Sequence, residues 1–320
     1  MKIIGTGSAM PKRTVTNAQL SEFLDTSDEW IVPRTGIKSR QVITDETLQT
    51  LAIDAAQKAL TDSGLKAEEI DFIICSNVAN NYVTPALSAF IQEALGCKCP
   101  FVDLNGACAG ALYALDIADA YISTGRAERI LIVAAEEVTK FCDWTQRETS
   151  VLFGDGAAAM VVAKDDSPCY TILTGDSRYK EVITYRRKLE KTPFEQEGQA
   201  VDQPMIMKGR DVFRMAVLCS QRDIKNLLQK ANMKAEDIKF FMLHQANKRI
   251  IDAIQEYLGL PEERFPSIID HTGNCSSASI LLLLDEVARS GKLAKGDKLM
   301  MSAFGAGFVT AAAIITWGHE

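Results

Sequence analysis

Apolar residues recur along the chain with two different spacings. Nearly continuous apolar runs, such as residues 70–75 and 130–135, are typical of strands that are buried on both faces of a sheet. In residues 51–62, 111–123 and 219–230, apolar side chains instead return every three or four positions, which predicts amphipathic helices. Strands that alternate with helices predict βαβ units and mixed sheets covered by helices. The pattern therefore predicts an α/β protein.

The two halves of the chain repeat one another in four segments that occur in the same order. Residues 66–72 (Lys-Ala-Glu-Glu-Ile-Asp-Phe) return as residues 234–240 (Lys-Ala-Glu-Asp-Ile-Lys-Phe), an offset of 168. The same offset places Cys108 opposite Ser276, each just before a predicted helix. The remaining matches pair 129–133 with 298–302, one residue later in register, and 153–159 with 304–313. Chance is a poor explanation for four ordered matches.

The last match has a shorter offset of 151, measured from Gly154 to Gly305. The first half must therefore carry an insertion of about 18 residues, which we assign to residues 136–152. We predict two pseudo-symmetric mixed α/β halves, residues 1–166 and 167–320, that pack around a pseudo-twofold axis. The polar turn at residues 165–168 marks the boundary, and the absence of a linker predicts one compact unit.

Composition narrows the functional classes. With 47% apolar and 24% charged residues, the chain is typical of a globular protein, and its net charge of −7 argues against a general nucleic-acid binder. The spacing of the eight cysteines indicates no disulfide framework, and Cys97 and Cys99 lack the partners of a metal site. The N-terminus does not resemble a signal peptide, and no apolar run could span a membrane. We expect a soluble cytoplasmic protein without a bound metal.

Cys108 is the first candidate for chemistry. It lies among small residues (Asn-Gly-Ala-Cys-Ala-Gly, 105–110), after a β-like run at 100–104 and before the helix predicted at 111–123. Backbone N–H groups and the dipole at a helix N-terminus favour a thiolate, which would make this cysteine a nucleophile. The alternative is a small buried cysteine without a chemical role.

Two polar residues of the second half are expected to converge on this thiol. His244 follows the strand predicted at 240–243, and Asn274 precedes the helix that mirrors the one after Cys108. Ligands gather at the carboxyl ends of strands in α/β sheets. A neutral imidazole and a carboxamide can both donate hydrogen bonds to an enolate oxygen. His271 is an alternative base, whereas His319 is close to the chain end.

Ten short motifs occur in order along essentially the whole chain: Gly5-Thr6-Gly7-Ser8, Asp28-Glu29-Trp30-Ile31, Arg34-Thr35-Gly36-Ile37, Gly106-Ala107-Cys108-Ala109-Gly110, Leu152-Phe153-Gly154-Asp155-Gly156, His244-Gln245-Ala246-Asn247, Arg249-Ile250, Gly273-Asn274, Ala278-Ser279 and Ala303-Phe304-Gly305. In these motifs the chain resembles the β-ketoacyl-acyl-carrier-protein synthase III enzymes of the thiolase superfamily. The resemblance implies a thiolase-like fold with αβαβα layers and a homodimer.

The resemblance implies a decarboxylative Claisen condensation that initiates fatty acid synthesis. Cys108 would take an acyl group from acyl-CoA, and malonyl-acyl-carrier protein would then lose CO2. His244 and Asn274 would stabilise the resulting enolate, which attacks the acyl-cysteine. The acyl oxyanion would be held by the backbone N–H groups of Cys108 and Ala306, where the family usually has glycine. No cofactor is implied beyond the CoA thioester substrate.

The resemblance also assigns binding residues. For CoA it points to Trp30, Arg34 and Arg147 around the adenine, and to a pantetheine tunnel lined by Gly209, Phe213, Ala246, Asn247 and Phe304. A basic patch for the acidic carrier protein would include Arg214, Lys248 and Arg249, with Lys208 and Arg210 nearby, but Glu256 stands where the family commonly has a basic residue. Val83 would fill the acyl pocket of the partner subunit, where Phe is usual.

The departures at Val83 and at Thr310, where the family has a Trp-Gly pair, keep an alternative open. The alternative is a paralogous condensing enzyme or acyltransferase that primes polyketide or other secondary-metabolite synthesis. A non-catalytic carrier-binding protein is a further alternative, although the intact set of Cys108, His244 and Asn274 argues against it. Because Val83 is smaller than Phe, we expect starters larger than acetyl to be accepted.

Overall fold

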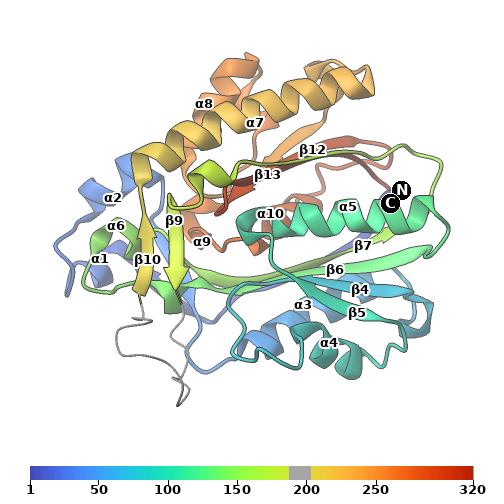
Figure 1. Cartoon of the computed structure of the whole chain (residues 1–320), viewed down its shortest axis with the longest axis horizontal. Helices are drawn as coiled ribbons and strands as arrows, with labels where there is room; N and C mark the ends of the chain where they lie inside the picture. Colours follow the sequence, from blue (N-terminus) through green and yellow to red (C-terminus); the bar gives the residue numbers. More distant parts are fainter. Residues whose placement is uncertain (187–202, 320) are drawn as a thin grey trace.

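The computed structural model describes residues 1–186 and 203–319, and its largest element is a nine-stranded sheet (Figure 1). The strands run in the spatial order β11-β12-β13-β1-β7-β6-β4-β5. Strand β8 pairs with residues 309–314 of β13, next to the short stretch of β13 that pairs with β1. Their bounds are β1 (Lys2–Ala9), β4 (Phe72–Ser76), β5 (Phe101–Leu104), β6 (Arg129–Glu137), β7 (Asp155–Ala163), β8 (Tyr170–Gly175), β11 (Phe240–Leu243), β12 (Lys298–Gly305) and β13 (Val309–Trp317).

The strand order is the same in the two parts of the sheet. In the first, β4 and β6 are parallel and β7 is antiparallel to β6, followed by β1. In the second, β11 and β12 are parallel and β13 is antiparallel to β12, followed by β8. A short parallel pairing of β1 with β13 joins the two parts. The predicted α/β class is confirmed, and the repeated order supports our proposal that the chain divides near residue 166.

Helices cover both outer faces of the sheet and fill the space between its two parts. The longer helices are α3 (Leu48–Asp62), α4 (Leu87–Leu95), α5 (Gly110–Ser123), α7 (Gly209–Ala231), α8 (Lys248–Leu258) and α10 (Ala278–Arg289). Figure 1 shows α3 and α4 on one outer face, α7 and α8 on the other, and α5 and α10 between the sheet parts. Three apolar cores of the described residues lie between these layers, and the layer order is αβαβα.

The alternation of side chains along β6 explains why its sequence is continuously apolar. Ile130 and Ile132 join the central core with α5 and α10, whereas Leu131 and Val133 join the outer core with α3. A strand whose two faces are both covered by helices needs apolar residues at every position. The sheet and its helices therefore hold the strand ends, on which the candidate site depends, in fixed positions.

Short elements fill the connections. They are β2 (Arg13–Thr16), α1 (Asn17–Leu20), α2 (Asp28–Thr35), β3 (Ser39–Val42), α6 (Arg147–Ser150), β9 (Ile183–Arg186), β10 (Gln203–Met207), α9 (Ile269–Thr272), and the 3-10 turns η1 (Ala67–Glu69), η2 (Ala107–Ala109), η3 (Val138–Phe141), η4 (Ser177–Tyr179), η5 (Ala235–Asp237) and η6 (Glu262–Arg264). The turns η1 and η5 coincide with the repeated heptapeptides.

The connection between β6 and β7 differs slightly from the expected insertion at 136–152. Glu136 and Glu137 still pair with β7, so this connection spans residues 138–154, against residues 306–308 between β12 and β13. The helix predicted at 219–230 is likewise longer, because α7 begins at Gly209. At Glu136 and Glu137 the cause is that charged residues at a strand end interrupt the apolar run from which the strand was predicted, whereas the first turns of α7 carry apolar residues such as Val212 and Ala216 that the prediction left out.

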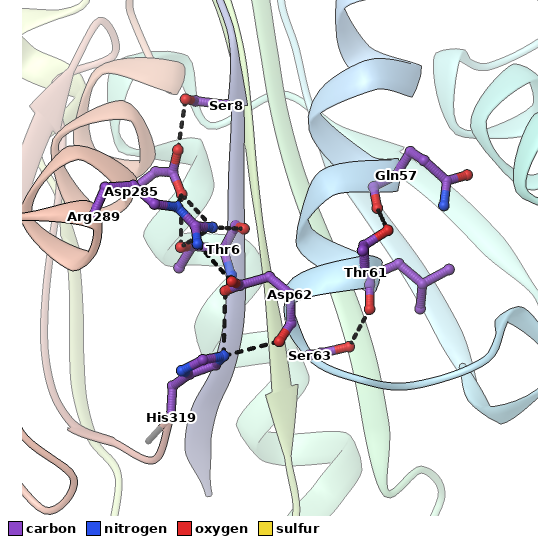
Figure 2. A network of polar contacts seen from close by, with 10 residues as sticks. Thr6, Ser8, Gln57, Thr61, Asp62, Ser63, Asp285, Arg289 and His319 are labelled. Carbon is purple, nitrogen blue, oxygen red and sulfur yellow. Dashed lines mark hydrogen bonds and ion pairs between the residues drawn. The ribbon is translucent and has the colours of Figure 1, made fainter.

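A polar network ties the two halves together (Figure 2). Arg289 on α10 donates to Asp62 on α3 at 2.6 Å and to the carbonyl oxygen of Thr6 on β1 at 2.7 Å. Asp285, one helical turn earlier, accepts from the hydroxyls of Thr6 and Ser8. These bonds connect the second-half helix α10 with two first-half elements, which fixes how the halves sit against each other.

In the described part of the chain, no helix is both long enough and apolar enough to cross a lipid bilayer.

Candidate active site

Cys108, His244 and Asn274 line one cavity of about 320 Å³. They come from three elements of two halves: η2 before α5, the end of β11, and the loop between α9 and α10. Most other lining side chains are apolar, among them Phe153, Phe213 and Phe304. The convergence expected from the sequence is therefore present, and it combines a thiol with two neutral hydrogen-bonding groups in an apolar enclosure.

The turn that carries Cys108 needs its small residues for steric reasons. A Cβ at Gly110 would lie 2.0 Å from the hydroxyl oxygen of Ser76, and a Cβ at Gly305 of β12 would lie 2.7 Å from the backbone nitrogen of Cys108. Ala107, just before the cysteine, adopts a left-handed conformation with φ of 46°. The turn is thus pressed against the end of β12, and this packing sets the position of the thiol.

The expectation that the helix N-terminus would favour a thiolate is wrong for this state of the chain. Burial raises the pKa of the Cys108 thiol to about 12, and the nearby Glu136 carboxyl raises it further. Hydrogen bonds from Ser276 and from the backbone of Cys108 act in the opposite direction but are weaker. Removal of the thiol from water in the cavity disfavours the charged thiolate. The thiol is therefore protonated at neutral pH.

His244 is held as a neutral imidazole. Its backbone N–H donates to the carbonyl oxygen of Ser302 on β12 at 2.9 Å, and its ring meets the edge of Phe304 with centroids 5.3 Å apart. The side chain is buried, and burial lowers its pKa to about 3. Neither ring nitrogen has a hydrogen-bond partner in the described part of the chain. Both nitrogens are therefore available to a group in the cavity.

Asn274 is fixed from both sides by backbone contacts. Its N–H donates to the carbonyl oxygen of Leu152, and its own carbonyl accepts from the N–H of Gly154. The side-chain oxygen accepts from the N–H of Ser276 at 2.8 Å, which leaves the NH2 group for other contacts. Gly273 has φ of 65° and lies against Leu152, so a glycine is required before Asn274. The first half thus orients an amide that belongs to the second.

The residues expected around pantetheine line the same cavity: Gly209, Phe213, Ala246, Asn247 and Phe304, together with Ala306. The expected adenine residues lie outside its wall but lie together. The Trp30 ring has the guanidinium of Arg34 4.8 Å from its centroid and that of Arg147 4.7 Å from it. The Asn247 side chain donates to the carbonyl oxygen of Arg34 at 3.0 Å, which links this cluster to the cavity.

Other predicted residues are not brought to the cavity. Val83 does not line it and is 83% exposed. Arg214 and Arg249 are exposed on α7 and α8, and Lys248 forms ion pairs with Asp252 and Glu262.

The alternative base His271 lies outside the cavity wall. It pairs with Asp270 and Glu286, which raise its pKa to about 9. It is therefore no longer a candidate for the cavity base.

Comparison with known proteins agrees with the site geometry. Residues 102–178 match the family described as 3-oxoacyl-[acyl-carrier-protein (ACP)] synthase III, and residues 228–317 match the C-terminal part of the same family. The chain is 40% identical over 320 residues to β-ketoacyl-[acyl-carrier-protein] synthase III of Clostridium perfringens, with 98% of each protein covered. The chain belongs to the β-ketoacyl-[acyl-carrier-protein] synthase III family.

Solved structures of synthase III enzymes have the same fold. The structure from Thermus thermophilus is 38% identical, covers 99% of each chain and superposes with a TM-score of 0.93. A priming β-ketosynthase from the R1128 polyketide pathway is 34% identical, covers 99% of this chain and 96% of its own, and has a TM-score of 0.92. The predicted thiolase-like fold and the predicted condensing-enzyme class are thereby confirmed.

Sequence reasoning missed a second group of synthase III cavity residues. Part of the wall comes from the β6–β7 connection and from the β9–β10 hairpin: Val138, Phe141, Leu152, Ile183, Tyr185, Met205 and Met207. The rings of Phe141 and Tyr185 stack with centroids 4.1 Å apart. The unusual length of the connection was visible in the sequence and could have indicated a role. The sequence did not indicate that β9 and β10 pair, because sixteen residues, 187–202, separate the two short strands along the chain.

Proposed function

We propose that this protein catalyses the decarboxylative condensation of a short-chain acyl-CoA with malonyl-acyl-carrier protein, through an acyl-cysteine at Cys108. One observation carries the proposal: a thiol and two neutral hydrogen-bond donors from opposite halves line the same apolar cavity. Membership of the synthase III family supports the reaction and its place at the start of fatty acid synthesis. We also propose a cytoplasmic location, which is where a condensing enzyme of primary metabolism would meet its substrates.

In the first stage, the Cys108 sulfur attacks the thioester carbonyl and CoA leaves. Negative charge develops on the carbonyl oxygen, and the backbone N–H groups of Cys108 and Ala306 would stabilise it. Both residues line the cavity, and the contact of Gly305 with the Cys108 backbone supports a close approach of the two amides. A backbone donor does not depend on the side chain, so alanine at position 306 is compatible with this role.

In the second stage, malonyl thioester loses CO2 and leaves an enolate. His244 and Asn274 would donate hydrogen bonds to its oxygen, each contributing about 3–4 kcal/mol if they resemble oxyanion-hole donors. The lowered pKa of His244 supports a neutral donor, which stabilises the enolate without transferring a full proton to it. The enolate carbon then attacks the acyl-cysteine and releases a β-ketoacyl product.

The long thioester substrates would enter past the cluster around Trp30. The flat faces of the indole and of the guanidinium groups suit adenine, and we propose that the ring inserts between Trp30 and Arg147. Pantetheine would follow Phe213, Ala246 and Asn247 to the thiol. For the carrier protein we propose contacts with Arg214, Lys248 and Arg249, although the ion pairs of Lys248 and the acidic Glu256 weaken this patch.

We propose that two copies of the chain form a homodimer in which Val83 reaches the acyl pocket of the partner. Val83 and Tyr82 are exposed by 83% and 50%, and Phe101 and Val102 are both 40% exposed on the edge strand β5. A group of exposed apolar side chains such as these is typical of a surface that binds another protein. A valine in this pocket leaves more room than Phe, so butyryl and isobutyryl starters should be accepted as well as acetyl.

The test is the mass of the intact protein after incubation with acetyl-, butyryl- and isobutyryl-CoA. We expect one added acyl group with each starter and none in Cys108→Ala, followed by loss of the adduct when malonyl-carrier protein is supplied. Acylation of the Cys108→Ala variant would contradict the proposed nucleophile. A strict preference for acetyl-CoA would contradict the proposed role of Val83.

Priming of polyketide synthesis is a second candidate function, favoured by the 34% identity to the R1128 priming ketosynthase. The chemistry at Cys108 would be the same, and the difference would lie in the carrier protein that accepts the product. Condensation rates with a fatty acid carrier protein and a polyketide carrier protein separate the two. A large preference for the polyketide carrier would replace the first proposal by this one.

A further inference from the structure

A fully buried carboxylate lies behind the candidate nucleophile. Glu136, at the end of β6, has none of its side chain exposed and makes no ion pair in the described part of the chain. Three groups donate to it: the Ser277 hydroxyl at 2.6 Å, the Ser276 hydroxyl at 3.2 Å, and the backbone N–H of Val78 at 3.1 Å. A buried carboxylate is costly, so one without a cation needs an explanation beyond folding.

Ser276 links this carboxylate to the cavity. It lines the cavity wall together with Cys108, and its side chain is near enough to the thiol to influence the thiol pKa. The same hydroxyl donates to Glu136. A hydroxyl can accept one hydrogen bond while it donates another. The order of groups is therefore thiol, hydroxyl and carboxylate: the first two line the same cavity, and the hydroxyl is hydrogen-bonded to the carboxylate.

We propose that Glu136 is a positioning residue that acts on Cys108 through the Ser276 hydroxyl and holds the thiol proton for as long as the acyl-enzyme exists. The inference rests on the proposed function, because it concerns the acyl transfer to Cys108. It addresses a problem that the geometry raises: a protonated thiol must lose its proton to attack a thioester, and the neutral His244 is assigned to the enolate.

The acyl transfer to Cys108 conserves bonds and protons. The bond between Cys108 sulfur and the acyl carbon forms, and the bond between that carbon and the CoA sulfur breaks. The thiol proton passes to the Ser276 oxygen, and the hydroxyl proton of Ser276 passes to Glu136. CoA leaves as a thiolate, which takes a proton from solvent. The chain then contains acyl-cysteine, an unchanged serine and a neutral Glu136.

The second stage returns the proton. When the enolate carbon attacks the acyl-cysteine, the new carbon–carbon bond forms and Cys108 leaves as a thiolate. Glu136 then gives its proton back to the sulfur through Ser276. One proton from solvent is consumed per cycle, by the departing CoA, and the decarboxylated malonyl carboxylate leaves as CO2. The groups of the chain end the cycle as they began it.

The surroundings of Glu136 suit this exchange. The titratable groups that its charge influences are the thiols of Cys75 on β4, Cys108 on η2 and Cys275 before α10. Burial raises the pKa of each thiol, so all three are uncharged at neutral pH. Burial also raises the pKa of Glu136 to about 7, although hydrogen bonds from Ser277, Val78 and Ser276 oppose the shift. Of the titratable groups in this cluster, Glu136 has the pKa nearest to neutral pH.

The experiment measures acylation of Cys108 in a single turnover, by intact-protein mass, across a range of pH. In the wild-type protein the rate constant should rise through the pKa of Glu136, near 7. In Glu136→Gln it should fall by about 100-fold or more, the usual contribution of a positioned proton acceptor. The remaining rate should increase steadily with pH, as direct ionisation of the thiol takes over.

Two serine variants separate proton transfer from structural support. Ser276→Ala breaks the path and should lower the maximal acylation rate as Glu136→Gln does. Ser277→Ala removes a donor from the same carboxylate but leaves the path intact. It should keep the maximal rate and move the acidic limb to higher pH, because the ionised form of Glu136 loses a stabilising bond. Carbon dioxide release from malonyl-carrier protein should change little in all three variants.

Wild-type acylation rates and pH profiles in Glu136→Gln would overturn the inference, and so would an equal loss of maximal rate in Ser276→Ala and Ser277→Ala. A wild-type protein that takes up no acyl group would instead contradict the proposed function. The two failures are therefore distinguishable. Thermal unfolding of each variant identifies misfolding, and the serine pair tests the inference if Glu136→Gln does not fold.

Discussion

The turns before α5 and α10 occupy equivalent places in the two halves, and each contains one non-glycine residue with positive φ, Ala107 at 46° and Ser276 at 48°. The next residue is Cys108 in the first half and Ser277 in the second. Each turn packs against the other half's sheet: Cys108 meets Gly305 at the end of β12, and Ser277 meets Glu136 at the end of β6. The backbones correspond, whereas the side chains that meet differ.

This difference explains why only one turn carries the proposed nucleophile. Opposite Cys108 stands a glycine, so the turn approaches β12 closely and the thiol lines the cavity. Opposite Ser277 stands a carboxylate, which binds the hydroxyl and keeps it buried. The offset of 168 had placed Cys108 opposite Ser276, but the positive φ values pair Cys108 with Ser277. The one-residue shift seen at β6 and β12 therefore already exists at this turn.

The largest effect is expected from Gly305→Ala, which fills the space under the Cys108 turn. The added methyl group would lie 2.7 Å from the Cys108 nitrogen and 2.9 Å from the Ala107 Cβ, so backbone must move. A displacement of a reacting group by about 1 Å can cost about 100-fold in rate. We expect at least that loss in single-turnover acylation, with a lower melting temperature.

Gly209→Ala is the stability control for this variant, because its Cβ would meet no atom within 4 Å. It should melt close to the wild-type temperature. An acylation rate in Gly305→Ala equal to the wild-type rate would show that the glycine is not what positions the thiol.

The next effect concerns the carboxylate on the other side of the comparison. The pKa of Glu136 is raised from 4.5 to about 7, so the folded chain binds more protons than the unfolded chain between these values. Its contribution to stability is therefore lost as pH rises from 5 to 8. Glu136→Gln removes the titration and should gain up to roughly 3 kcal/mol relative to wild type over this range.

The measurement is the difference in unfolding free energy, by urea denaturation, between variant and wild type at each pH. Asp155 also has a raised pKa, about 6, but it titrates in both proteins and cancels in the difference. A difference that stays constant between pH 5 and pH 8 would mean that Glu136 does not titrate there.

A smaller effect is expected at Asp223 on α7, a buried carboxylate of the second half. Thr310 on β13 donates to it, and Arg222 binds its other oxygen. Thr310→Val keeps the volume but leaves one carboxylate oxygen without its donor, which should cost about 1–3 kcal/mol in unfolding free energy. Thr174→Val is the comparison variant, since its hydroxyl contacts Thr310 and the Arg222 guanidinium but not Asp223, and it should cost less. An equal loss in both variants would contradict this assignment.

The smallest effect is expected when the two turns are made chemically alike. In a Cys108→Ala background, Ser277→Cys places a thiol at the equivalent position of the second half. Because Ser277 is fully buried and faces Glu136, the new thiol should not be acylated by acetyl-CoA. Intact-protein mass gives the answer, and an acyl adduct on this variant would show that position alone, without the glycine at β12, is sufficient.

Residue type and place along the chain were enough to predict the three central side chains. Cys108, His244 and Asn274 each follow a recognisable strand or precede a recognisable helix, and strand ends in an α/β sheet meet at one edge. The fold class followed from the same alternation, and the duplication predicted the repeated strand order. These features are local or are repeated in sequence, which makes them visible without coordinates.

The remaining features depend on contacts between distant segments. Glu136 was assigned to the insertion from the change in repeat offset alone, and its serine partners lie about 140 residues away. The pKa of Cys108 could not be predicted, because it is set by the apolar enclosure and not by the helix that follows. The pairing of Phe141 with Tyr185 likewise joins a connection to a hairpin that had no sequence signal.

The most direct test of the account measures the two partial reactions separately in Cys108→Ala and in His244→Ala. Acyl uptake from acetyl-CoA reports the first-half turn, and CO2 release from malonyl-carrier protein reports the second-half donors. We predict that Cys108→Ala loses acyl uptake but still releases CO2, whereas His244→Ala keeps acyl uptake and loses CO2 release. If His244→Ala fails to take up the acyl group, or if Cys108→Ala fails to release CO2, the two halves do not divide the chemistry as proposed.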